Sequence, residues 1–123
     1  MTDEQALRIG EVAESTSLSL RTLRHYEDIG LVIPSARTEG GFRLYGAEDI
    51  ARLMIVRRMK PLGYSLEEMR ALLDVVDALR RTPGDPQLRT ELEAILDEAR
   101  SRRERLATQV AMADEFLAQL DGV

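Results

Sequence analysis

The sequence has no cysteine, no tryptophan, one histidine and five aromatic residues among its 123 residues. The absence of cysteine excludes disulfide bonds, thiolate metal sites and redox sensing by thiols. One histidine cannot assemble a metal site alone. No apolar run is long enough for a signal peptide or a membrane helix, so we expect a cytoplasmic location. The core must be built mainly from Leu, Ile, Val, Met and Ala, which favours helices.

Motifs of the common enzyme classes are absent as well. The sequence has no P-loop, no dinucleotide-binding glycine pattern, no histidine cluster and no nucleophile-elbow serine. The acidic pairs Glu48-Asp49 and Glu67-Glu68 suit the first turns of helices, where the helix dipole favours negative charge. We therefore expect no enzymatic activity, no cofactor and no bound metal.

Charge is distributed unevenly along the chain, whose formal net charge is −5. Residues 21–60 contain eight Lys or Arg against five Asp or Glu, whereas residues 61–123 contain eight against thirteen. Basic charge is therefore concentrated in one segment. Because phosphate neutralisation supplies most of the nonspecific affinity for DNA, we expect this acidic chain to need two copies for specific binding.

The clearest pattern lies between residues 9 and 45. Residues 9–16 predict a first helix, Ser17 and Leu18 a tight turn, and Ser19 the N-cap of a second helix. One stripe of that second helix faces inward through Leu20, Leu23 and Glu27. The opposite face and its flanks carry side chains suited to bases and phosphates: Arg21, Thr22, Arg24, His25 and Tyr26. A glycine-turned hairpin that ends in Arg43 and Tyr45 follows, so the order of elements predicts a winged helix-turn-helix.

Four ordered motifs make the pattern more specific. They are TLRHYE at residues 22–27, GLVIP at 30–34, GFRLY at 41–45 after Arg37, and LGYSLEEM at 62–69. Together they resemble the MerR family of bacterial transcription regulators from Ile9 to Met69. Two positions depart from the family pattern, because Ser17 stands where glycine is frequent and His25 where a second tyrosine is frequent. The resemblance implies an all-α fold with a small β-hairpin wing.

The second helix, the wing and the end of the third helix are the segments expected to contact double-stranded DNA. The expected contact residues are Ser19, Arg21, Thr22, Arg24, His25, Tyr26, Arg37, Arg43, Tyr45 and Lys60. For the two tyrosines the alternative is a core position with the hydroxyl at the rim. For His25 the alternative is an imidazole that is merely exposed, and for the cationic residues it is solvated surface charge.

A second structural unit is predicted after the break at residues 82–86, TPGDP. Asp85 suits the N-cap and Pro86 the first position of a helix that continues to Leu120 without Gly or Pro. Its apolar seam alternates spacings of four and three through Leu92, Leu96, Ala99, Arg103, Leu106, Val110, Ala113, Leu117 and Leu120. Arg103 is the exception, and it either extends to solvent or fixes the register against a partner carboxylate.

By resemblance, this helix forms a long antiparallel coiled-coil with its twin. The predicted domains are a winged helix-turn-helix DNA-binding domain at residues 1–80, a linker at 81–85 and a dimerisation helix at 86–123. The resemblance further implies a homodimer on a pseudo-palindromic promoter operator, where distortion of the spacer DNA aligns the promoter for RNA polymerase.

Alternatives of other kinds remain at this stage. The protein could be a constitutive architectural DNA-bending protein, a simple repressor without effector, or a coiled-coil interaction protein with a vestigial helix-turn-helix. The resemblance is to a short member of the family without a separate effector domain. Three alternatives then remain for the signal that the protein senses. They are no effector visible in this chain, a small apolar ligand bound between the helices, or a protein partner. No motif of the sequence encodes the operator sequence or the direction of regulation.

Overall fold

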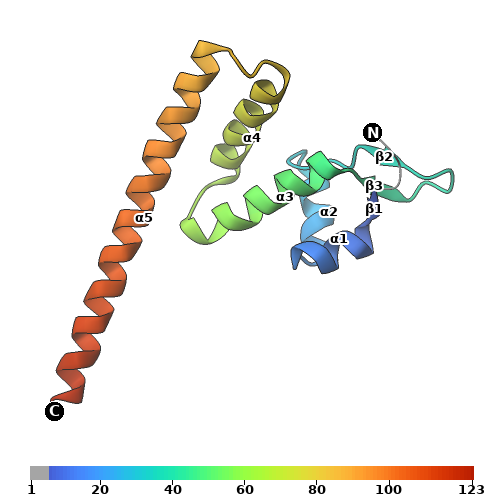
Figure 1. Cartoon of the computed structure of the whole chain (residues 1–123). Coiled ribbons are helices and arrows are strands. Elements are labelled where there is room, and N and C mark those ends of the chain that lie inside the picture. Colours follow the sequence, from blue (N-terminus) through green and yellow to red (C-terminus); the bar gives the residue numbers. More distant parts are fainter. Residues whose placement is uncertain (1–5) are drawn as a thin grey trace. The chain divides into compact units, whose positions relative to one another are not determined.

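The computed structural model describes residues 6–123 and groups the chain into two compact units, Met1–Leu73 and Asp74–Val123. Its elements are labelled in Figure 1 and follow the order β1 (Leu7–Arg8), α1 (Ile9–Thr16), α2 (Leu20–Asp28), β2 (Ala36–Arg37), β3 (Arg43–Tyr45), α3 (Ala47–Met59), the short 3-10 helix η2 (Lys60–Leu62), α4 (Leu66–Arg81) and α5 (Pro86–Asp121). The predicted fold class, helical with a small wing, is confirmed. The two units separate inside α4, before the proposed linker at 81–85, so the proposed domain limits stay a prediction.

Helices α1 and α2 form the helix-turn-helix. Ser17 ends α1 in the left-handed region at φ 58°, a conformation that glycine adopts at lower cost. The Ser19 hydroxyl then accepts a hydrogen bond from the Thr22 amide at 3.0 Å, which is the predicted N-cap of α2. Leu23 and Tyr26 are buried on the inner face of α2, so the polar residues between them are directed outward.

The wing is part of a three-stranded antiparallel sheet with strand order β1-β3-β2. The hairpin of β2 and β3 agrees with the prediction, and Figure 1 shows its loop projecting beyond the helices of this unit. Gly41 makes the turn possible, since it adopts φ 85° and donates its amide to the Thr38 carbonyl at 2.9 Å. Strand β1 was not predicted. It pairs Leu7 with Tyr45.

Asp49 organises the start of α3 and is 2 % exposed. Its carboxylate accepts hydrogen bonds from the amide of Gly46 at 2.8 Å and from the amide and hydroxyl of Ser35, the amide at 3.0 Å. Arg52 pairs with the other carboxylate oxygen at 3.1 Å. One buried carboxylate therefore joins the segment before the wing to the helix that follows it, next to a core that includes Leu53 and Val56.

Helix α4 begins with a reciprocal capping box, in which the Ser65 hydroxyl accepts from the Glu68 amide and Glu68 accepts from the Ser65 amide. One turn later Arg70 reaches the C-terminal end of α2. Its guanidinium donates to the carbonyl of Ile29 at 2.8 Å and to that of Gly30 at 3.1 Å. A cation at this position also complements the negative end of the helix dipole.

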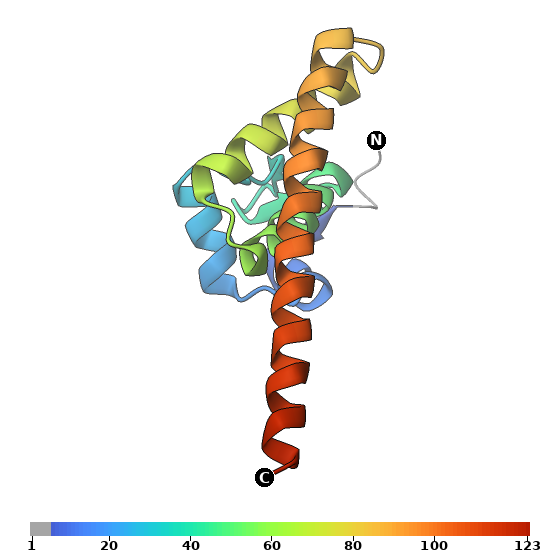
Figure 2. The same ribbon diagram turned by 90° about the vertical axis from the view of Figure 1, so that its left-hand side faces the viewer.

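Helix α5 runs unbroken from Pro86 to Asp121, as Figures 1 and 2 show, and confirms the predicted helix. Asp85 caps the start of α5, because its carboxylate accepts hydrogen bonds from the backbone amides of Gln87 and Leu88. In the predicted seam, Leu92 and Ala99 are half-buried and the later members are exposed. Arg103 is exposed and pairs with Glu104 of the same helix at 3.1 Å. Across residues 6–123 no helix combines the length and apolar character needed to cross a membrane.

Candidate nucleic-acid interface

The outward face of α2 presents Arg21, Arg24 and His25, all of which are exposed. At its N-terminal end the Ser19 hydroxyl donates to the Thr22 hydroxyl at 2.9 Å, so these two predicted contact residues support each other. Their hydrogen bonds fix the first turn of the helix. The side chains that follow are therefore held at a defined angle on a rigid element, as recognition of base edges requires.

The wing arginines are held by Glu27, a residue that helical periodicity assigns to the inward stripe. The Glu27 carboxylate of α2 pairs with Arg37 of β2 at 2.8 Å and, through its other oxygen, with Arg43 of β3. This second hydrogen bond raises the pKa of Arg43, and burial opposes it in part. Arg37 also donates to the Gly41 carbonyl at 3.2 Å. Both arginines of the wing that were predicted to contact DNA thus form ion pairs within the chain.

Two predicted contact residues are core residues instead. Tyr45 is 0 % exposed, and its hydroxyl is buried without a hydrogen-bond partner among the described residues. A DNA phosphate cannot reach a hydroxyl in that position, which corrects the predicted contact at Tyr45. Tyr26 is 4 % exposed and packs in the same cluster, so its side chain is also largely unavailable. Burial raises the pKa of both phenols.

Tyr45→Phe tests the core assignment. A buried hydroxyl without a partner costs free energy, so we expect the variant to keep or gain about 1 kcal/mol in its free energy of unfolding. Operator affinity should be unchanged. Chemical denaturation and a gel-shift titration measure the two quantities. If the variant unfolds like the wild type but binds DNA more weakly, the predicted contact between the Tyr45 hydroxyl and a phosphate would be supported after all.

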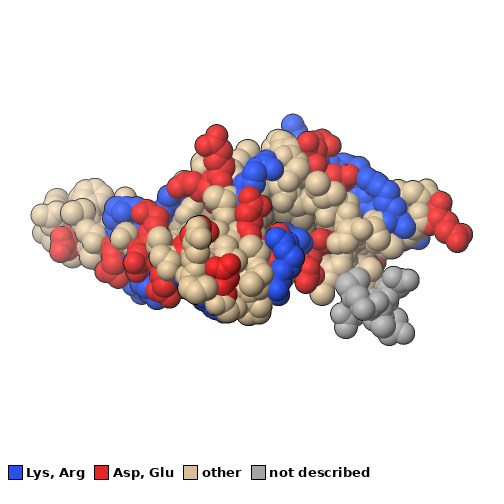
Figure 3. Space-filling model, turned by 90° about the horizontal axis from the view of Figure 1, so that it is seen from above, with Lys and Arg blue, Asp and Glu red and all other residues tan. Residues whose placement is uncertain are grey.

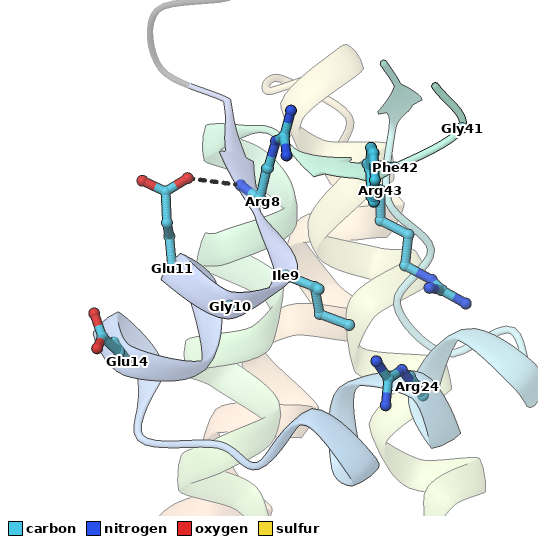
Figure 4. Close-up of a pocket in the computed structure, with 9 residues that line it drawn as sticks. All are labelled: Arg8, Ile9, Gly10, Glu11, Glu14, Arg24, Gly41, Phe42 and Arg43. Carbon is cyan, nitrogen blue, oxygen red and sulfur yellow. Dashed lines mark hydrogen bonds between the residues drawn. The ribbon is translucent and has the colours of Figure 1, made fainter. Parts of the chain in front are cut away.

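A concave groove of about 750 Å³ lies between α1, α2 and the wing. It brings together three guanidinium groups from three elements, those of Arg8, Arg24 and Arg43. Figure 4 shows Arg43 extending from β3 toward α2, which carries Arg24. Glu11 and Glu14 of α1 also line the groove and add two carboxylates to it. The Arg8 guanidinium lies over the Phe42 ring at 4.8 Å from its centroid. Arg8 was not predicted as a site residue because β1 was not predicted, and Phe42 was identified only as part of the wing motif.

The remaining predicted residue, Lys60, is exposed at the start of η2 and does not line this groove. Acidic and basic side chains are intermixed on the face drawn in Figure 3, so net charge alone does not mark an interface. No group of three or more His, Cys, Asp or Glu in the described part of the chain could hold a metal ion. The candidate interface is therefore defined by α2 and the groove beside it.

Comparison with known proteins decides the family. Residues 7–75 match the family described as MerR HTH family regulatory protein, and residues 50–122 match the family described as MerR, DNA binding. The chain belongs to the MerR family. As a member of the MerR family, it is a DNA-binding transcriptional regulator.

Individual MerR-like relatives agree over most of the chain. The nodulation protein NolA of Bradyrhizobium elkanii is 37 % identical over 121 residues, which are 94 % of this chain and 55 % of NolA. CueR of Salmonella typhi, an HTH-type transcriptional regulator, is 34 % identical over 88 % of this chain and 80 % of CueR. The crystal structure of SkgA from Caulobacter crescentus, another HTH-type regulator, superposes with a TM-score of 0.61 at 31 % identity, covering 95 % of this chain and 78 % of SkgA. The chain thus spans about half the length of NolA.

Proposed function

We propose that this MerR-family chain acts as a homodimer whose two winged units bind the two halves of a pseudo-palindromic promoter operator. The main support for this proposal is the outward face of α2. Arg21, Arg24 and His25 are exposed there, while Leu23 and Tyr26 anchor the opposite face. Arginine can pair with the major-groove edge of guanine through two hydrogen bonds, and the N-terminal residues of a recognition helix enter that groove first.

The groove beside α2 suits the sugar-phosphate backbone next to the major groove. Arg8, Arg24 and Arg43 supply guanidinium groups for phosphate oxygens, and they outnumber the carboxylates of Glu11 and Glu14 in the groove lining. Arg43 would use nitrogens other than the Nε atom that pairs with Glu27. Phe42 is 58 % exposed and gives this wall an apolar surface. Backbone contacts of this kind position the protein on the duplex, and the residues of α2 then discriminate between base pairs.

The second half of α5 supports the homodimer. Every residue from Arg103 to Val123 is exposed in this chain. The apolar members of that stretch repeat at spacings of four and three: Leu106, Val110, Ala113, Leu117 and Leu120. A stripe with this period is typical of an antiparallel or parallel coiled coil. Pairing with a second copy in antiparallel orientation removes the stripe from water and makes the dimer symmetric.

A symmetric dimer fixes the separation of its two recognition helices. Operator DNA with a different half-site spacing must bend or untwist to engage both, at a cost of about 1 to 6 kcal/mol. Such distortion of a spacer brings two promoter elements onto the same face of the duplex, where RNA polymerase in the cytoplasm can bind both. Distortion of promoter DNA is therefore the mechanism that we propose for regulation.

Footprinting on the promoter region of the protein's own gene tests this function, and permutation gels measure bending. Arg21→Ala should lower operator affinity by about 1 to 3 kcal/mol and relax base preference at one position of each half-site. Arg100→Ala, an exposed arginine of α5, is the matched control and should bind like the wild type.

Three outcomes separate the alternatives. Bent or untwisted operator DNA together with altered transcription supports the proposal. Undistorted DNA would contradict the distortion mechanism and leave a simple repressor that occludes polymerase, and distortion without any effect on transcription would indicate an architectural DNA-bending protein. Wild-type affinity and selectivity of Arg21→Ala would disprove the assignment of α2 as the recognition helix.

A further inference from the structure

Glu27 joins the recognition helix to both strands of the wing. Its two carboxylate oxygens bind different arginines, Arg37 of β2 and Arg43 of β3, which lie ten and sixteen positions away in the sequence. Arg37 in turn holds the Gly41 carbonyl at the turn of the hairpin. A single side chain of α2 is thus connected by hydrogen bonds to the start, the turn and the end of the wing.

The strengths of the two contacts differ with their exposure. The Glu27 side chain is 16 % exposed and that of Arg43 is 31 % exposed, whereas that of Arg37 is 48 % exposed. Hydrogen bonds between ionised groups are stronger than neutral ones, but solvent screens the more exposed pair. The contact with Arg43 therefore contributes most to holding the wing, and the contact with Arg37 adds a second point of attachment.

We propose that Glu27 is a positioning residue that fixes the wing relative to α2 and thereby sets the selectivity of this protein for its operator over other DNA. The inference rests on the proposed function. Helix and wing bind one duplex, so a fixed spacing favours DNA whose groove and backbone match both, and little conformational freedom is lost on binding. A carboxylate beside a DNA interface repels phosphate, which disfavours nonspecific binding and fits positioning rather than contact.

Two variants separate geometry from charge. Glu27→Asp keeps the charge but is one methylene shorter and cannot span both arginines, whereas Glu27→Gln removes the charge. Glu39→Gln is the matched control, because Glu39 lies in the wing, is exposed and has no hydrogen bond or ion pair within the described residues. The probes are a duplex selected by the wild-type protein from a random-sequence library and poly(dI-dC). Selectivity is the ratio of the two affinities.

We expect Glu27→Asp to lose roughly three- to tenfold in selectivity while its affinity for poly(dI-dC) stays unchanged. Glu27→Gln should lose selectivity by a similar factor while its affinity for poly(dI-dC) rises, because one negative charge is gone. Glu39→Gln should raise both affinities together and keep the selectivity of the wild type. A loss of selectivity while the affinity for poly(dI-dC) is unchanged or higher is a result that a folding defect does not produce.

Wild-type selectivity in both Glu27 variants would overturn the inference while leaving the DNA-binding function intact. Parallel loss of both affinities with a lower unfolding temperature would also overturn it, in favour of a purely structural salt bridge. If the wild-type protein selects no sequence from the library, the proposed function itself fails, and that result is visible before any variant is made.

Discussion

Leu117→Asp is expected to convert the proposed dimer into a monomer and to abolish operator binding. Leu117 is 57 % exposed in the single chain, so the new carboxylate is hydrated there and the fold of the chain is retained. In a dimer the substitution occurs twice and replaces buried leucines by charges. We expect a loss of about 3 to 6 kcal/mol per dimer, which is roughly a hundred- to ten-thousandfold in dissociation constant.

Analytical ultracentrifugation and gel-shift titration measure the two effects. Thr108→Asp is the matched control, because nine residues at about 100° each place it on the opposite side of α5 from Leu117. It adds the same charge at an exposed position and should stay dimeric. A wild-type protein that sediments as a monomer at micromolar concentration, or a Leu117→Asp dimer, would show that the seam does not mediate assembly.

Asp49→Ala is expected to destabilise the unit Met1–Leu73 strongly. It removes the acceptor of the Gly46 and Ser35 amides and leaves Arg52 beside a cavity. Unsatisfied donors and a broken, largely buried ion pair together cost about 3 kcal/mol or more. For a unit of this size that loss lowers the midpoint of thermal unfolding by roughly 12 to 24 °C.

Circular dichroism during heating measures the midpoint. Asp114→Ala is the control, because Asp114 is exposed on α5 and should change the midpoint little. Asp49→Asn keeps the shape and one acceptor oxygen, so we expect an intermediate value. An Asp49→Ala protein that melts with the wild type would mean that the segment before the wing and the start of α3 are held together by packing alone.

Local signals were sufficient for the helices. Ser19 and Asp85 are caps that act on amides two or three residues away, and Pro86 fits only the first turn of a helix, so the starts of α2 and α5 could be predicted. Strand β1 could not be predicted, since two residues are too few to show a period-2 alternation of apolar and polar side chains. Its pairing with β3 depends on tertiary structure.

The candidate site was only partly predictable for a related reason. The outward residues of α2 follow from helical periodicity, whereas the partners of Glu27 depend on how the hairpin folds back onto the helix. Tyr45 illustrates the same limit. An aromatic residue at the end of a wing strand can face DNA or the core, and its pairing opposite Leu7 of β1 puts it in the core of the unit.

Arg70 links α4 to the C-terminal end of α2, the proposed recognition helix, so that the two helices move together. Hydrogen bonds of 2.8 and 3.1 Å to the Ile29 and Gly30 carbonyls tolerate little stretching, so a shift of the first turns of α4 pulls on the C-terminal end of α2. The middle of α2 is anchored in the core by Leu23 and Tyr26. A displacement at one end of a helix that is anchored in its middle changes the tilt of the helix. A displacement of the first turns of α4 is therefore expected to change the orientation of Arg21, the residue that we propose to contact the bases.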